Sequence, residues 1–164
     1  MGVCNGFQSL VQLKVFGENV RLLGNEKSGI PQPFVNRWVD LSLELPSSDA
    51  LPLRLPLRHG EGRLDFTELG EGVSPFLYYR DNNFENGSRD RIAGLRGEVA
   101  SSHFLALMPH PEIALRPFHS PNTSGPDYVE KARLMKWDLR GDGVVFFERL
   151  AKLLSWELSA ELSP

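Results

Sequence analysis

A single cysteine near the start of the chain is the residue best suited to chemistry. Cys4 lies between Gly2 and Gly6 in the run Gly-Val-Cys-Asn-Gly. This pattern has the form of a nucleophile elbow, a sharp strand-to-helix turn that projects one nucleophile and in which flanking glycines allow close backbone approach. The alternative is that a lone cysteine is a small buried hydrophobic residue. The two glycines favour a reactive thiol.

A histidine and a glutamate far downstream complete the chemistry that such a thiol needs. His110 and Glu112 lie in the run Met-Pro-His-Pro-Glu at 108–112. The prolines stop a strand and fix a turn, and in an extended turn residues two apart point the same way. The carboxylate then reaches the ring nitrogen that does not face Cys4. Alone, this pentapeptide is more typical of a surface turn, but with the elbow it predicts a Cys4, His110 and Glu112 triad.

Several short runs, in this order, resemble class I glutamine amidotransferases. They are Gly-Val-Cys-Asn-Gly-Phe-Gln at 2–8, Arg-His-Gly-Glu-Gly-Arg at 58–63, Asn-Gly-Ser at 86–88, Ile-Ala-Gly at 92–94 and Met-Pro-His-Pro-Glu at 108–112. More narrowly, the chain is similar to the glutaminase subunit or domain of phosphoribosylformylglycinamidine synthase, an enzyme of purine biosynthesis. The most diagnostic run is Cys-Asn-Gly-Phe-Gln.

The resemblance implies hydrolysis of the glutamine side-chain amide. Cys4 would attack the carboxamide, His110 would protonate the departing ammonia and then activate water, and Glu112 would hold His110. The ammonia would pass to a synthetase subunit or domain that uses ATP and formylglycinamide ribonucleotide to make formylglycinamidine ribonucleotide. No phosphate-cradling glycine loop occurs in these residues, so we expect no cofactor in this chain, and ATP and Mg only on the synthetase partner.

The resemblance also implies a set of residues that bind glutamine. They are Asn5, Gln8, His59, Gly60 and Ser88. The backbone N–H of Asn5 would be one oxyanion donor, while the family takes the other from a glycine loop before the elbow. Without the family, the run His-Gly-Glu-Gly fits an exposed turn and Asn-Gly a tight turn. His59 ranks below His110 as a base because it lacks the Pro-Glu neighbour.

Two other classes of function remain open at this point. The chain fits a non-catalytic product, such as a truncated or mis-started amidotransferase fragment. It also fits a different thiol hydrolase or peptidase on a similar elbow, although the full run from Cys4 to Gln8 speaks against that. A substrate screen with glutamine, esters and peptides separates the two enzymes.

Composition indicates an ordinary water-soluble chain. It has 164 residues, 41% hydrophobic and 24% charged, which suits one domain with a sizeable core. The net charge of −3 and the scattered basic residues give no sign of a nucleic-acid partner. One cysteine excludes an internal disulfide and a multi-cysteine metal site, so we expect no metal and a reducing, cytoplasmic setting. No apolar run suits a membrane span.

The elements that must position these residues follow from hydrophobic spacing. Helical spacing predicts a helix from Asn5 to about Val15, stopped by Gly17. Cys4 would then lie at a helix N-terminus, where partial positive charge favours the thiolate. Alternation predicts a strand at 37–44, and a second strand towards Arg58 whose prolines suit an edge.

The remaining elements are predicted more briefly. Residues 21–36 indicate a loop, 76–80 a short strand, 92–95 and 104–108 a hairpin, and 142–158 an amphipathic helix. Residues 113–141 depart from the compact small-subunit form and indicate an inserted surface element, with a short helix at 127–137.

The resemblance implies an α/β, flavodoxin-like class I glutamine amidotransferase domain with a mostly parallel sheet. We expect residues 1–164 to form a single but partial domain, lacking the part before the elbow, because only three residues precede Cys4. An oxyanion donor would be lost with it, and one such donor is worth roughly 10²–10³ in rate. We therefore expect weak or no glutaminase activity from the isolated chain.

Overall fold

The computed structural model describes residues 1–46, 48–80, 86–99, 102–116 and 140–161. It divides into two compact units, Met1–His110 and Pro111–Pro164. The prediction of a single domain stays a prediction. None of the helices in the described ranges is long and apolar enough to cross a membrane.

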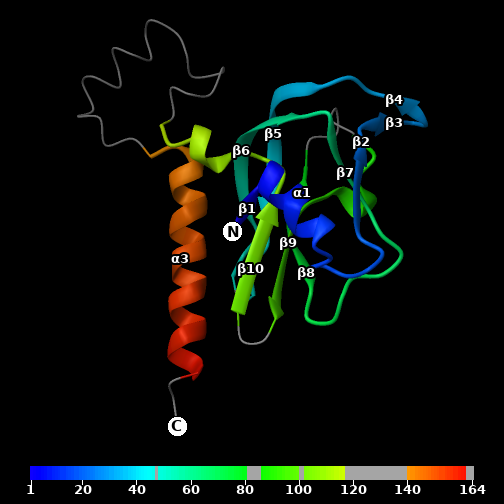
Figure 1. The fold of residues 1–164 in the computed structure, drawn as a ribbon. Coiled ribbons are helices and arrows are strands. Elements are labelled where there is room, and N and C mark those ends of the chain that lie inside the picture. The colour runs from blue at the N-terminus through cyan, green and yellow to red at the C-terminus, as the bar shows by residue number, and fades with distance from the viewer. Residues whose placement is uncertain (47, 81–85, 100–101, 117–139, 162–164) are drawn as a thin grey trace, which may run out of the picture. The chain divides into compact units, whose positions relative to one another are not determined.

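A six-stranded sheet forms the centre of the first unit (Figure 1). Its order is β1 (Gly2–Val3), β10 (Ser102–Leu107), β9 (Ile92–Val99), β8 (Ser74–Tyr79), β5 (Val35–Leu43) and β6 (Leu51–His59). Among the described strands only β1 and β10 pair in parallel, and the other pairs are antiparallel. The prediction of a mostly parallel sheet is therefore wrong for these strands. Hairpin-type links, which need no crossover helix, connect β5 to β6 and β9 to β10.

The first helix, α1 (Asn5–Gln12), follows β1 directly and packs beside β10 and β2 (Figure 1). Phe7 and Val11, one helical turn apart, are its buried residues, and the Phe7 ring meets Phe16 edge-on at 5.2 Å. The predicted helix is confirmed, but it ends before Val15. Lys14 has a φ of 59°, which an α-helix does not accommodate.

The segment predicted as a loop at 21–36 contains short strands, so that prediction is wrong. Strand β2 (Arg21–Gly24) pairs antiparallel with β7 (Glu61–Asp65), and β3 (Glu26–Lys27) pairs with β4 (Ile30–Pro31). The turn between β3 and β4 is Ser28-Gly29, with φ values of 51° and 80°. Two positive φ values in a two-residue turn characterise a type I′ hairpin.

Buried side chains of the long strands form much of the core. The inward residues of β5 and β6 are fully or almost fully buried, as are Phe76, Leu77 and Leu95 on the strands beside them. In β6 the prolines occupy the last strand of the described sheet, where a missing N–H costs least, which confirms the edge-strand prediction. The predicted hairpin is also confirmed as β9 and β10. A short 3₁₀ turn, η1 (Arg89–Arg91), precedes β9.

The second unit contains the 3₁₀ turn η2 (Pro111–Ile113) and helix α3 (Asp142–Glu161). The predicted helix from Asp142 is confirmed. The N–H of Gly143 donates to the carbonyl of Ala114 at 2.9 Å, which ties the start of α3 to the segment after η2. The predicted insertion falls mainly on 117–139, and its helix at 127–137 lies outside the described residues.

Candidate functional site

Cys4 occupies a sharp turn between strand β1 and helix α1. Its φ of 52° and ψ of −103° lie in a region that non-glycine residues rarely adopt. Such a conformation costs of order 1–3 kcal/mol and clusters at active sites. The turn is fixed by hydrogen bonds from the Cys4 N–H to the Leu107 carbonyl at 2.8 Å and from the Gln8 N–H to the Cys4 carbonyl at 3.1 Å. This is the geometry of the predicted elbow, with Cys4 as the residue before the first turn of α1.

The two glycines around Cys4 are not equivalent. A Cβ on Gly2 would lie 2.7 Å from the backbone carbonyl carbon and oxygen of Gly6, so only glycine fits there. A Cβ on Gly6 would meet no described atom within 4 Å. The expectation that flanking glycines allow close approach therefore applies to Gly2 alone.

His110 reaches the same end of the sheet through the one parallel strand pair. Residues Gly2 and Val3 pair with Ala106 and Leu107, so the chain leaves β1 and β10 at the same edge. Residues just after the carboxyl ends of adjacent parallel strands commonly form sites in α/β folds. The His110 N–H donates to the Pro56 carbonyl at 2.8 Å, which brings the end of β6 to this edge as well.

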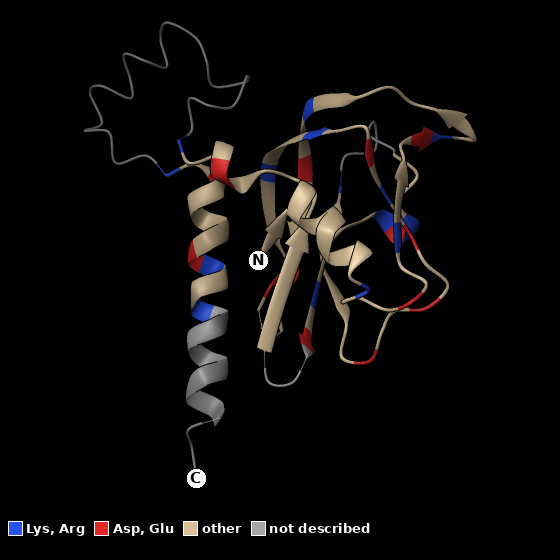
Figure 2. Ribbon diagram, viewed as in Figure 1, with Lys and Arg blue, Asp and Glu red and all other residues tan. Residues whose placement is uncertain are grey.

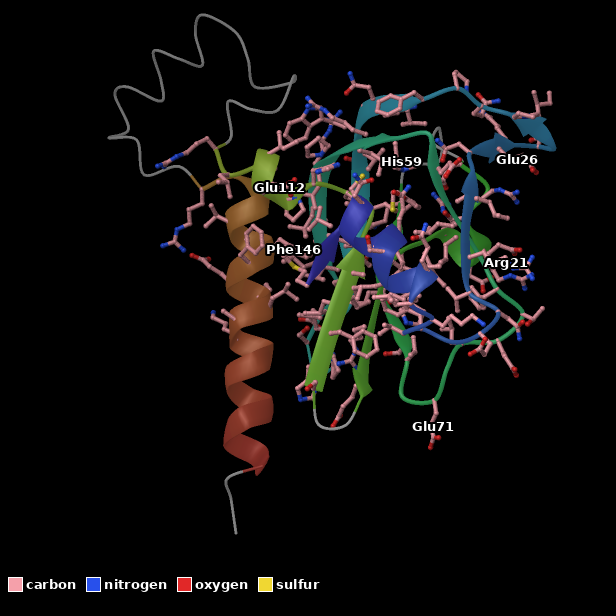
Figure 3. The ribbon with its side chains drawn as sticks, in the orientation of Figure 1. Arg21, Glu26, His59, Glu71, Glu112 and Phe146 are labelled. Carbon is pink, nitrogen blue, oxygen red and sulfur yellow. The ribbon has the colours of Figure 1, made fainter. Side chains whose placement is uncertain are left out.

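The end of β6 supplies contacts to Cys4. The Cys4 Sγ lies 3.5 Å from the Arg58 carbonyl oxygen, at hydrogen-bonding distance for a thiol donor. The next residue is His59, the last residue of β6 (Figure 3). It is only 3% exposed. Among the described atoms neither of its ring nitrogens has a hydrogen-bond partner. Burial, and secondly the charge of His110, lowers the pKa of His59 from 6.5 to about 4. His59 is therefore a neutral residue at pH 7.

Tyr79 on β8 lies within electrostatic range of Cys4 and was not among the residues predicted from the sequence. It is 4% exposed. Burial raises the pKa of the Tyr79 phenol, and the charge of Cys4 raises it further. Its only sequence signal was its place in an aromatic strand.

The predicted glutamine-binding residues fall into two groups. Asn5 begins α1 with an exposed side chain, while the Gln8 Nε2 donates to the Glu61 carbonyl at 2.9 Å. Gly60, which follows His59, is half-buried. The Ser88 hydroxyl accepts from the Leu64 N–H at 3.1 Å and donates to the Gly62 carbonyl at 3.4 Å. The structure thus gathers Gln8, His59, Gly60 and Ser88 around the link between β6 and β7, apart from Asn5, and the contact of all five with substrate stays a prediction.

Glu112 belongs to the second unit. It lies in the 3₁₀ turn η2 with an exposed side chain, so the extended turn assumed from the sequence is wrong. A 3₁₀ turn has about three residues per turn, so the backbone does not place residues two apart on one side. The orienting role of Glu112 stays a prediction.

Two buried asparagines near these residues were not among the site residues predicted from the sequence. Asn25 and Asn86 are each 2% exposed. Their side-chain amides donate to the carbonyls of His59 and Gly62, at 3.0 and 3.1 Å. Asn86 belongs to the Asn-Gly-Ser run, but Asn25 lies in a segment without any motif. Only the long-range hydrogen bonds identify it.

Acidic and basic residues are interspersed along the ribbon of the first unit (Figure 2). Partly exposed pairs such as Arg63 with Glu26 at 3.5 Å and Arg89 with Asp65 at 3.7 Å contribute little stability. In the described part of the chain, no group of three or more His, Cys, Asp or Glu residues is arranged to hold a metal ion.

The fold and the position of Cys4 define the class of protein to which the chain belongs. A mixed α/β domain with a thiol on a strand-to-helix elbow is the fold of a class I glutamine amidotransferase. The chain belongs to the family described as CobB/CobQ-like glutamine amidotransferase domain, whose match covers residues 1–140. This confirms the resemblance seen in the sequence and the predicted α/β class I glutamine amidotransferase fold, apart from the mostly parallel sheet.

Several of the similar proteins are PurQ subunits of phosphoribosylformylglycinamidine synthase. Phosphoribosylformylglycinamidine synthase subunit PurQ of Thermotoga maritima is 35% identical over 122 residues, which cover 70% of this chain and 51% of the relative. The PurQ subunit of Pyrobaculum aerophilum is 34% identical over 132 residues, 76% of this chain and 55% of the relative. A chain in the structure of PurLQS from Thermotoga maritima matches with a TM-score of 0.58 and 31% identity, over 84% of this chain and 61% of that one. This chain thus spans about half the length of the curated relatives it matches.

Proposed function

We propose that this chain carries the glutaminase centre of a phosphoribosylformylglycinamidine synthase. The observation that carries the proposal is Cys4, the only cysteine, held with a φ of 52° at the edge where β1 and β10 end in parallel. A strained backbone at a nucleophile, beside a histidine that follows the neighbouring strand, is typical of thiol acyl-transfer sites.

The proposed reaction converts glutamine and water to glutamate and ammonia. The Cys4 thiolate adds to the side-chain carboxamide carbon, and the tetrahedral intermediate collapses as His110 protonates the departing ammonia. The resulting thioester is hydrolysed by a water that gives its proton to His110, which releases glutamate and regenerates the thiol. Glu112 orients His110, and the Asn5 N–H donates to the oxyanion.

His59 is not the base in this proposal. A group with a pKa of about 4 is a poor proton acceptor near neutral pH. Burial also leaves its ring only 3% exposed, so it has little room to meet substrate directly. We assign it instead to the wall of the site, with Gly60, Gln8 and Ser88 near the bound glutamine.

The proposed partner is a synthetase subunit or domain that uses the ammonia. One structure that contains a chain similar to this one is that of PurLQS from Thermotoga maritima. The ATP and Mg of amide transfer belong to that partner in our proposal, and the reaction takes place in the cytoplasm.

Covalent trapping tests the glutaminase centre directly. A glutamine-derived diazoketone should add one label to the chain, at Cys4, and more rapidly than an analogue without the α-amino group. The Cys4→Ala variant should take no label, as measured by intact mass and peptide mapping. Persistent labelling of Cys4→Ala, or equal rates with both reagents, would contradict the proposal.

A further inference from the structure

The last residue of β6, Gly60 and the first two residues of β7 form a segment whose backbone carbonyls all accept hydrogen bonds; we call residues 59–62 the 59–62 loop. Helix α1 holds one side. The Arg58 carbonyl, just before the loop, lies 3.5 Å from the Cys4 Sγ, and the Glu61 carbonyl accepts from the Gln8 Nε2 at 2.9 Å. The loop is therefore tied directly to the segment that carries the nucleophile.

Asn25 holds the opposite side of the loop. Its side-chain Nδ2 donates to the His59 carbonyl at 3.0 Å, and its backbone N–H donates to the Gly60 carbonyl at 3.1 Å. The Gln32 N–H donates in turn to the Asn25 carbonyl at 2.8 Å. Asn25 is 2% exposed, so these hydrogen bonds form away from water, where losing one costs the most.

Asn86 holds the end of the loop. Its Nδ2 donates to the Gly62 carbonyl at 3.1 Å, and its Oδ1 accepts from the Ser88 N–H at 3.1 Å. The Glu26 N–H donates to the Asn86 carbonyl at 3.1 Å, so the residue next to Asn25 is bonded to Asn86. Each carbonyl from His59 to Gly62 therefore accepts a hydrogen bond. The Glu26 N–H links the segment that contains Asn25 to Asn86.

Strand pairing holds the 59–62 loop at His59, which pairs with Val35, and at Glu61, which pairs with Gly24, but not at its two glycines. The loop contains glycine at 60 and 62, and glycine has the widest backbone freedom of any residue. A Cβ on Gly62 would come within 2.3 Å of the His59 ring, so the ring lies directly against the glycine backbone. A loop of this kind keeps one conformation only if its surroundings impose it.

We propose that Asn25 and Asn86 are positioning residues that hold the 59–62 loop in the arrangement that binds glutamine against Cys4. The inference rests on the proposed glutaminase function. Neither residue contacts the reacting atoms; each acts through the loop carbonyl that its amide holds. Displacing a substrate-binding loop by about 1 Å can cost on the order of 10²-fold in rate.

The test compares two labels of Cys4 in the full 164-residue chain. The glutamine-derived diazoketone needs the glutamine site, whereas iodoacetamide needs only an accessible thiol. Asn25→Asp keeps the shape of the side chain but turns an acceptor towards the His59 carbonyl. We expect it to slow diazoketone labelling roughly tenfold or more and to change the iodoacetamide rate less than about threefold. Asn86→Asp should behave in the same way.

The matched control is Asn19→Asp, which makes the same chemical change at an exposed position. It should leave both labelling rates as in the wild type. Asn25→Ser and Asn86→Ser, which remove the amide without adding charge, serve if an Asp variant unfolds. Urea denaturation reports on folding, and an unfolded variant should label with iodoacetamide as fast as the wild type does in urea.

Each outcome decides one of the two proposals. If the wild type labels no faster with the diazoketone than with its analogue without the α-amino group, the glutaminase proposal fails. If the wild type is selective and the folded Asn25 and Asn86 variants are equally selective, the positioning proposal is overturned. It is also overturned if both Asp and both Ser variants unfold, because the asparagines then serve folding rather than the site.

Discussion

At the scale of single residues, Cys4 has a strained backbone conformation and His59 is held in its neutral form. Cys4 is held at a φ of 52° by hydrogen bonds to Leu107 and Gln8. His59, at the end of β6, stays uncharged because it is buried and lies near His110. A neutral His59 with a pKa of about 4 is a poor proton acceptor at pH 7, which agrees with a proposed mechanism that uses another residue as the base.

The pKa of His59 makes stability depend on pH. Its folded-state pKa of about 4 lies below the unfolded value of 6.5, so the unfolded chain binds the proton more readily. The stability that neutral His59 contributes is complete above pH 6.5 and is lost as the pH falls through about 4. The free energy of unfolding should fall by at most about 3 kcal/mol from this cause. His59→Gln should therefore flatten the decline in the free energy of unfolding between pH 6.5 and 4, measured by urea denaturation. Parallel curves for variant and wild type would show that His59 does not cause the decline.

The two glycines beside Cys4 should respond oppositely to alanine. Gly2→Ala places a Cβ 2.7 Å from Gly6 backbone atoms and should destabilise the fold by about 1–3 kcal/mol. Gly6→Ala meets open space inside α1 and should stabilise it by up to about 1 kcal/mol through helix propensity. Urea denaturation of both variants measures the difference. Equal losses would mean that close approach does not select Gly2.

Sequence motifs predict part of the site, and residue-scale chemistry explains the limit. Cys4 and His110 were identified because the elbow and the His-Pro-Glu run have fixed local spacing. Asn25 and Tyr79 were missed because each is a single residue whose role depends on partners far along the chain. Local spacing carries no information about such long-range contacts.

At the scale of elements, the length of a strand decides whether it can be predicted from the sequence. Strands β5 and β6 each contain nine residues, enough to display alternation. Strand β2 has four residues and β3 and β4 have two each, too few for a period to appear. These strands form because β7 and the Ser28-Gly29 turn supply pairing and chain reversal, so their segment was wrongly predicted as a loop.

The turn between β3 and β4 gives an element-scale prediction. Gly29 has a φ of 80°, so Gly29→Ala should destabilise the hairpin by about 1 kcal/mol. Amide hydrogen exchange at residues 26–31, followed by NMR, should become faster. Gly24→Ala is the matched control, because a Cβ there meets no described atom within 4 Å and needs no positive φ. Equal exchange in both variants would argue against a type I′ turn.

At the scale of the whole molecule, family membership gave the domain type but not the direction of every strand. The mostly parallel sheet expected from the resemblance is represented among the described residues by the β1 and β10 pair alone. That pair is the one the site uses, because it brings Cys4 and His110 to the same edge. The antiparallel strands beside it form the larger part of the described core and deliver the 59–62 loop.

This arrangement makes the site depend on the core through β6. Leu55 is fully buried in β6, opposite Val39 on β5 and shortly before the residues that contact Cys4. Leu55→Ala should lower the free energy of unfolding by about 2–5 kcal/mol, because the cavity adds to the lost burial. Native-state alkylation of Cys4 by iodoacetamide should accelerate in proportion, since Cys4 is half-buried and becomes exposed when the sheet opens.

The control for Leu55 is a leucine outside the core. Leu13 is 73% exposed, and Leu13→Ala should change stability by no more than about 0.5 kcal/mol and leave the alkylation rate unchanged. If Leu55→Ala is destabilised as predicted but Cys4 is not alkylated faster, Cys4 is accessible without opening of the sheet. The strand would then support the fold, while α1 and the 59–62 loop alone would hold the nucleophile in place.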